Sequence, residues 1–462
     1  MSFFSLLEYI PSISSIVLKH YTKGPPKKSW DLKLHLAIAM IKGDNRMSKL
    51  SIEQTQKEFE KYFMFKAPPH ITIKEVILDE EYRQKSKAHL EKILKPYDDV
   101  LDENWKDPND KGLHGEWQYI NEQISETDNV ILYLHGGGFC VGSPKSVALN
   151  YRLSPQNQFP AALCDSIAAY LYLTNPGPNA GFEPINPKRI ILAGESAGGN
   201  LVFSTLLVLR DAGLPLPAGA IVMADLTQSL PSKWNSEIDK IDFVPSALSY
   251  FTNVPSSPAM DEYHANAKAL ADKIALKNPT IVSHPSFTEV PRFNFYCANE
   301  APMLAESLGN LPPILCQVGG DEKIRDDAIL ISHKAASPHK YQLPSYATKN
   351  FEKSPFKKPT KVILEVYDDM PHIWQTFTFS KHSQLALGRC RDFIKRVTST
   401  EDNDNISMID LIKEEEVPPS ISISPSFIAM RVGTDGTIRE LNETDRDCLK
   451  WDKIGVVPKP KL

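Results

Sequence analysis

The chain has 462 residues, of which 42% are hydrophobic and 24% charged, a composition typical of a globular protein with one large domain plus appendages. Its net charge of -5, with no basic stripe interleaved with aromatic residues, argues against a nucleic-acid partner. No metal-ligand spacing is visible, and the six scattered cysteines favour reduced thiols, with a lumenal disulfide as the alternative.

The N-terminal residues combine apolar and basic stretches. Residues 3–10 and 16–18 are mostly apolar, but Glu8 and Pro11 interrupt them, and lysines follow rather than precede them. This pattern is too short and broken for a membrane span and is unlike a signal peptide. Two interpretations of residues 1–20 stay open: a cap helix over an active site, or an amphipathic anchor on a membrane or lipid surface. The expected location is accordingly the cytoplasm, or the surface of the endoplasmic reticulum or of a lipid body.

Residues 29–115 look helical and charged, with a break at Pro68 and Pro69. We therefore predict an N-terminal region, residues 1–115, that is separate from a catalytic domain at residues 116–400.

A glycine run follows the first apolar segment of strand length, residues 130–134. This segment lacks helical spacing, which suits a strand buried on both faces. The run reads His135, Gly136, Gly137, Gly138 and Phe139. Glycine N–H groups can turn toward a ligand oxygen because no Cβ blocks its approach. The run is therefore a candidate oxyanion cradle, with His135 as a hydrogen-bonded scaffold rather than a base.

A second apolar segment, residues 189–193, leads into the sequence Gly-Glu-Ser-Ala-Gly at residues 194–198, and an apolar helix is predicted at residues 200–210. Ser196 thus lies on a strand-to-helix turn, which is the setting of a nucleophile elbow. The two glycines relieve crowding there, and the helix N-terminus adds positive potential. Ser196 is the candidate nucleophile.

A serine nucleophile needs a base, and in enzymes with this elbow the chain order is serine, acid, histidine. A predicted strand at residues 361–367 ends just before His372, where a mobile imidazole could reach Ser196. His372 is therefore the predicted base. The competing histidines fall within or beside predicted helices or loops, and they are His333, His339 and His382.

The acid is expected in the loop after another predicted strand, residues 313–318. Asp321 and Glu322 are adjacent there, and composition does not decide which of the two faces His372. Acids in such loops and at helix starts commonly cap helices or face solvent. The lesser candidates are for that reason Asp225, Asp326 and Asp327.

Cys140 follows the glycine run, so its thiol is an alternative candidate nucleophile. No adjacent base or helix N-terminus is evident to lower the pKa of this thiol. Cys140 is therefore predicted to be a buried structural residue.

Residues from about 115 to 395 resemble the hormone-sensitive-lipase-like family of α/β hydrolases, which includes arylacetamide deacetylases and steryl acetyl hydrolases. Besides the two glycine motifs, residues 150–155 and 159–165 look like the family's segment between them. The resemblance implies an α/β-hydrolase fold, with a mostly parallel central sheet, helices on both faces and a helical cap. The N-terminal region and an insertion at about residues 226–311 would form this cap.

The resemblance also implies site residues. The family's triad acid opens a segment whose register residues 322–327 hold here, which favours Glu322; because the family more often carries aspartate, Asp321 stays the alternative acid. The positions that match the family's oxyanion donors are Gly137, Gly138 and Ala197. Glu195 stands where the family commonly has aspartate, and we expect it to support the site without contacting substrate.

From about residue 400 the composition turns polar and acidic. Residues 401–462 are therefore predicted to be a polar C-terminal tail, in which Asp435 and Gly436 indicate a hairpin.

Together these patterns predict a serine hydrolase that cleaves carboxylic esters through an acyl-enzyme, with no cofactor or metal. Ser196 attacks, His372 transfers the proton and Glu322 orients the imidazole. The apolar N-terminus and the family resemblance favour a small lipophilic ester, such as a sterol acetate or an acylglycerol. Two alternatives stay open: an amidase or deacetylase with the same triad, and a catalytically silent hydrolase-like binding protein.

Overall fold

The computed structural model describes most of the chain. The described residues are 3–43, 49–62, 68–95, 98, 101, 103–108, 110, 112–120, 129–142, 149–223, 256–262, 265, 302, 305–340, 354–399, 406–412 and 417–441. The predicted insertion at residues 226–311 lies largely outside them, as does Asp225.

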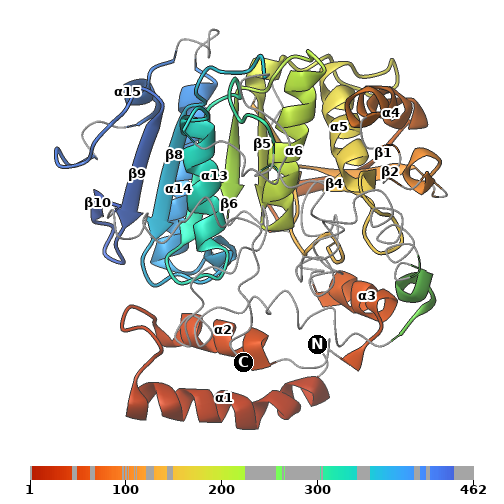
Figure 1. Ribbon diagram of the computed structural model, residues 1–462. Coiled ribbons are helices and arrows are strands. Elements are labelled where there is room, and N and C mark those ends of the chain that lie inside the picture. Colours follow the sequence, from red (N-terminus) through yellow and green to blue (C-terminus); the bar gives the residue numbers. More distant parts are fainter. Residues whose placement is uncertain are drawn as a thin grey trace, which may run out of the picture.

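Within the described residues, the central sheet has seven strands in the order β10-β9-β8-β7-β6-β5-β3 (Figure 1). Their bounds are β3 Val130–Leu134, β5 Ile190–Glu195, β6 Gly219–Met223, β7 Ile314–Gly319, β8 Val362–Tyr367, β9 Phe427–Val432 and β10 Ile438–Glu440. The pairs from β3 to β9 are parallel, whereas β10 runs antiparallel to β9. Strands β6, β7 and β8 are buried along their whole length, as expected where helices cover both faces.

Helices cover both faces of this sheet. They are α5 Ala161–Thr174, α6 Ala197–Asp211 and α13 Arg325–Ala336 on one face and α14 Lys381–Val397 on the other. The side chains of β5 alternate between the faces: Ile190 and Leu192 join the core of α5 and α6, whereas Ile191 and Ala193 join the core of α14. This is the predicted mostly parallel sheet with helices on both faces.

A second, antiparallel sheet consists of β1 Ile71–Leu78, β2 Leu113–Ile120 and β4 Leu149–Asn150. The prediction that residues 29–115 are helical is confirmed for α2 Leu32–Gly43, α3 Ile52–Tyr62 and α4 Glu80–Leu94 but is wrong for β1. Five of the eight residues of β1 are isoleucine, valine or threonine, whose β-branched side chains favour an extended backbone. The short remaining elements are the four-residue helix α15 Met408–Leu411 and the 3-10 helices Asn104–Lys106, Pro187–Arg189 and Trp374–Thr376.

Two N-terminal helices lie beyond the carboxyl ends of the central strands, below the sheet in Figure 1. The first of them, α1 Phe3–Lys23, packs on α2. Trp30 and Leu34 in turn contact the end of β8, where they share a core with Tyr367 and Met370. Among the described helices, none is both long and apolar enough to cross a membrane. Residues 30–38 therefore pack at the edge of the sheet that carries the candidate residues, and α1 packs on them through α2.

The C-terminal residues extend the sheet past residue 400, where the sequence prediction ended the catalytic domain. Strand β9 pairs in parallel with β8, and the buried Ile428 and Met430 join the core under α14. The hairpin predicted at Asp435 and Gly436 is confirmed, because β9 and β10 pair on either side of it. Buried and half-buried residues alternate along β9, as expected for a strand whose two faces differ in burial.

Candidate active site

Ser196 lies at a sharp turn between β5 and α6. Its φ of 55° and ψ of -120° place a residue other than glycine in a sparsely populated region of the backbone. The Ser196 N–H donates a hydrogen bond of 2.9 Å to the carbonyl of Met223 at the end of β6. The turn is thus held by the neighbouring strand in the strained form that lifts a nucleophile above a sheet.

The two motif glycines allow this turn to touch the end of β3. A Cβ on Gly198 would stand 1.9 Å from the carbonyl oxygen of Leu134, and a Cβ on Gly194 would stand 2.5 Å from the carbonyl oxygen of Gly198. Both contacts involve backbone, which cannot rotate away as a side chain would. The elbow and the start of the glycine run therefore lie in direct contact.

The glycine run lies beside the serine because β3 and β5 are parallel neighbours, with Leu134 opposite Gly194. A Cβ on Gly136 would come within 3.1 Å of the Ser196 Cβ. Gly137 and Gly138 follow with φ values of 104° and 61°, which side chains rarely allow. The fold thus brings the predicted oxyanion donors of both loops, Ala197 included, to one edge of the sheet.

His135 is a fixed part of this scaffold. Its ring stacks on Tyr151 with centroids 4.1 Å apart, and Nδ1 lies 2.7 Å from the carbonyl oxygen of Gly136. Burial lowers the pKa of His135 to about 4, so the ring is neutral at physiological pH. A neutral, enclosed ring agrees with the predicted scaffold role.

Cys140 is buried beside the same loop. Burial raises the pKa of its thiol to about 12, so the thiolate is scarce at neutral pH. The structural role predicted for Cys140 is consistent with this environment.

The candidate acid and base meet across the ends of β7 and β8. An oxygen of Glu322, Oε2, lies 3.6 Å from Nδ1 of His372, and both side chains are nearly fully buried. The carboxylate of Asp321 instead contacts Lys27, with 2.9 Å between Nζ and Oδ1. Of the two adjacent acids, Glu322 is the one that the structure places against the histidine.

The other candidates lie in the elements expected for them. His333 is in α13, and its ring lies tilted against that of Phe427 with centroids 4.6 Å apart, while His382 is in the first turn of α14. Asp326 bonds to its neighbour Arg325 in the first turn of α13. His339 is exposed in the turn after that helix. In the part of the chain that is described, no group of three or more His, Cys, Asp or Glu residues is arranged to hold a metal ion.

Glu195 connects the elbow to the glycine run. Its Oε1 accepts a hydrogen bond of 2.6 Å from the N–H of Gly136. Burial raises the pKa of Glu195 to about 7, against hydrogen bonds from Tyr133 and Gly136 and the nearby charge of His372, which lower it. The influence of His372 on Glu195 also indicates that the imidazole lies within electrostatic range of the elbow.

The raised pKa of Glu195 predicts a pH-dependent stability. Because the folded chain holds this proton more tightly than the unfolded chain, the contribution to the free energy of unfolding is complete below about pH 4.5 and is lost as the pH rises through about 7. Glu195→Gln should therefore be as stable as the parent near pH 4.5 and more stable at pH 8, by on the order of 2 to 3 kcal/mol. Urea unfolding at both pH values measures this, with the exposed Glu183→Gln as control. Equal pH profiles for parent and Glu195→Gln would contradict it.

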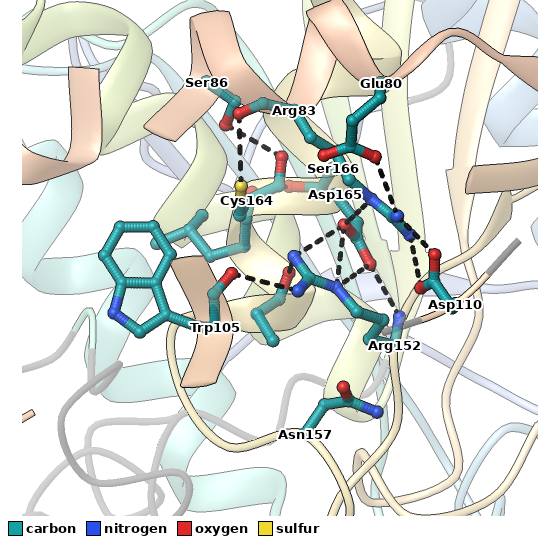
Figure 2. Close-up of polar contacts among 12 residues, drawn as sticks. Glu80, Arg83, Ser86, Trp105, Asp110, Arg152, Asn157, Cys164, Asp165 and Ser166 are labelled. Atoms are coloured by element: carbon teal, nitrogen blue, oxygen red, sulfur yellow. Dashed lines mark hydrogen bonds and ion pairs between the residues drawn. The ribbon is translucent and has the colours of Figure 1, made fainter. Parts of the chain in front are cut away.

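Arg83, Asp110, Arg152 and Asp165 form an ion cluster, in which all but Asp110 are buried (Figure 2). Asp165 in α5 accepts hydrogen bonds of 2.9 Å from the guanidinium groups of both Arg83 and Arg152. Arg83 of α4 also pairs with both oxygens of Asp110, at 2.7 and 2.9 Å. Arg83, Arg152 and Asp165 are nearly fully buried, so removing any one would leave a buried charge without its partner.

This cluster is linked to the glycine run through residues close to Arg152. The hydroxyl of Tyr151 donates to the carbonyl of His135 at 2.6 Å, and the N–H of Ser154 donates to the carbonyl of Phe139 at 2.8 Å. The cluster is not apparent from the sequence, although Arg152 and Asp165 lie in the two segments that resemble the family. The signal was Asp165, a charge within an otherwise apolar helix.

Comparison with known proteins agrees with this geometry. The family described as "alpha/beta hydrolase fold" matches residues 145–342. An acetyl-hydrolase of Streptomyces hygroscopicus is 30% identical over 291 residues, which are 59% of this chain and 75% of the relative. The chain belongs to the α/β-hydrolase family. This confirms the predicted fold class and places the chain among hydrolytic enzymes.

Two further comparisons extend over different lengths of this α/β hydrolase. Human arylacetamide deacetylase-like 2 is 36% identical over 120 residues, which are 20% of this chain and 28% of the human protein. The crystal structure of an esterase from the bacterial hormone-sensitive lipase family gives a TM-score of 0.49 at 22% identity, covering 80% of this chain and 99% of that one.

Proposed function

We propose that this α/β hydrolase cleaves carboxylic esters through an acyl-enzyme formed on Ser196. The observation that carries the proposal is the strained turn at Ser196 packed directly against the glycine run. Such a turn costs free energy to fold and is found where an exposed nucleophile is needed. The acetyl-hydrolase relative supports an acyl group as the part that is transferred.

In the proposed reaction, the hydroxyl oxygen of Ser196 attacks the ester carbonyl while His372 takes its proton. Glu322, 3.6 Å from the far side of the ring, stabilises the imidazolium that forms. The oxyanion of the tetrahedral intermediate accepts hydrogen bonds from the N–H groups of Gly137, Gly138 and Ala197, each worth on the order of 3 kcal/mol.

The intermediate then collapses, and the bond to the alcohol oxygen breaks as His372 returns its proton to the leaving alcohol. A water molecule, deprotonated by His372, attacks the acyl-enzyme and releases the acid. Ser196 regains its proton and the cycle closes. These steps need neither an oxidant nor a metal ion.

We further propose that the substrates are small lipophilic esters, with sterol acetates and acylglycerols as the leading examples. This rests on the family resemblance and on the uncharged, exposed residues of α1, among them Ile10, Leu18 and Tyr21. Because these apolar residues are exposed, we also propose that residues 1–20 associate with a membrane or lipid surface.

A hydrolysis panel with the full chain tests the reaction and the substrate class. The panel contains p-nitrophenyl esters of increasing acyl length, a sterol acetate, an acylglycerol and matched anilides, offered both in solution and on anionic vesicles. We expect ester cleavage that Ser196→Ala reduces by about 10⁴-fold or more, with faster cleavage of vesicle-borne esters. Anilides cleaved faster than esters would favour the amidase alternative. A chain that neither cleaves esters nor labels with a fluorophosphonate would favour the silent binding protein.

A further inference from the structure

The segment between α1 and α2 contacts both loops that carry the candidate acid and base. The ammonium of Lys27 lies 2.9 Å from each carboxylate oxygen of Asp321 and 3.5 Å from Oδ1 of Asp369. Asp321 directly precedes Glu322, and Asp369 lies three residues before His372. The side chain of Lys27 therefore joins the loop of Asp321 and Glu322, the acid loop, to the loop of Asp369 and His372, the histidine loop.

The two residues that follow Lys28 fix this segment to the histidine loop. The hydroxyl of Ser29 donates to Oδ2 of Asp369 at 2.8 Å, and the indole N–H of Trp30 donates to the carbonyl of the same residue at 2.8 Å. Trp30 is 2% exposed and packs against Met370 and Trp374. The backbone at Lys27 is thus held in place by the neighbouring contacts of Ser29 and Trp30.

The histidine loop has a conformation that benefits from such support. Asp369 has a φ of 61°, which is unfavourable for a residue with a side chain. The backbone already links the two loops through a hydrogen bond of 3.1 Å from the Asp321 N–H to the carbonyl of Met370. Lys27 adds an electrostatic link outside that backbone contact.

We propose that Lys27 is a positioning residue for ester hydrolysis, holding Asp321 and Asp369 so that Glu322 stays aligned with His372. The inference rests on the proposed function. The 3.6 Å between Glu322 and His372 is longer than a hydrogen bond, so small movements of either loop decide whether the pair can act.

The charge state of Lys27 suits this role. Burial lowers the pKa of the ammonium, but the hydrogen bond and charge of Asp321 and the charge of Asp369 outweigh it and raise the pKa above the ordinary value. Lys27 therefore stays charged across the neutral range. Its ion pairs are partly exposed, so they contribute little to global stability, and their loss should leave the chain folded.

Steady-state kinetics of Lys27→Met on a soluble ester test the inference. We expect kcat to fall about fivefold with KM nearly unchanged and with the melting temperature of the parent. Lys27→Arg, which keeps the charge, should restore most of kcat. Lys28→Met is the matched control, because Lys28 is the adjacent lysine and is exposed; it should match the parent.

Two further readouts separate positioning from a merely structural role. Salt at 1 M should lower kcat of the parent toward that of Lys27→Met and leave the variant unaffected, because salt screens partly exposed ion pairs. Lys27→Met combined with Asp321→Asn should lose no more than either single variant, as expected for one shared contact.

Contrary results are equally clear. If the parent hydrolyses esters and Lys27→Met has the kcat of Lys28→Met, the positioning role is wrong and the proposed function stands. If the loss of activity of Lys27→Met follows a loss of folded protein, Lys27 is structural and the inference is again wrong. If the parent itself neither hydrolyses nor labels, the proposed function fails and the inference fails with it.

Discussion

Replacing Glu322 by glutamine should lower kcat/KM for ester hydrolysis by about 10³- to 10⁴-fold, whereas Asp321→Asn should lose no more than about fivefold. Glutamine keeps the size of the side chain but cannot stabilise the imidazolium or fix the tautomer of His372. Asp321 differs because its carboxylate contacts Lys27, so its amide variant should lose only the support that Lys27 provides. Initial rates over a substrate range, with melting temperatures for both variants, measure the difference.

The two variants are each other's control, since they neutralise neighbouring carboxyl groups in one loop. A loss in Asp321→Asn as deep as that in Glu322→Gln, with both variants folded, would transfer the acid role to Asp321. Glu322→Asp adds a further check, because the family more often carries aspartate at this position. This variant should retain much more activity than Glu322→Gln.

Replacing Gly198 by alanine should have the largest effect on stability, with a loss of more than about 4 kcal/mol in the free energy of unfolding or no folded protein at all. The added Cβ would meet the carbonyl oxygen of Leu134 at 1.9 Å. The carbonyl belongs to the backbone at the end of β3, and the Cβ would be fixed to the backbone in the first turn of α6. Neither can move without separating the elbow from β3. Urea unfolding followed by circular dichroism measures the loss.

Gly388→Ala is the matched control for this change. Gly388 lies within α14, and a Cβ there would meet nothing within 4 Å. Alanine should therefore stabilise the chain, by up to about 1 kcal/mol, because it favours the helix and restricts the unfolded chain. A Gly198→Ala protein as stable as the parent would show that the elbow can separate from β3 at little cost.

The positions of the candidate nucleophile and base in the fold could be predicted from the sequence because their neighbourhoods are local. Parallel strands buried on both faces appear as short apolar runs, so β3, β5, β7 and β8 were visible as patterns. Each candidate residue follows such a run directly. Ser196 and His372 could therefore be placed at the carboxyl edge of the sheet without knowing any long-range contact.

Other features depend on partners far away in the chain. Composition alone did not separate Asp321 from Glu322, because the partners that distinguish them, Lys27 and His372, lie far away in the chain. The hairpin of β9 and β10 was predicted, but not the parallel pairing of β9 with β8, because that pairing joins segments about 60 residues apart across a polar stretch. The buried cluster around Asp165 brings together three separate segments, and charges alone do not reveal which of them will be buried.

The contacts of the N-terminal segment also bear on how the chain is made. Ser29 and Asp369 are separated by 340 residues, so the segment around Ser29, which is synthesised before the histidine loop, must wait for that loop before these contacts can form. Until then the apolar residues around Trp30, Leu34 and Ile38 have no core to join. A nascent chain should thus need protection from aggregation during much of its synthesis, and it should gain activity abruptly, once the last strands have joined the sheet.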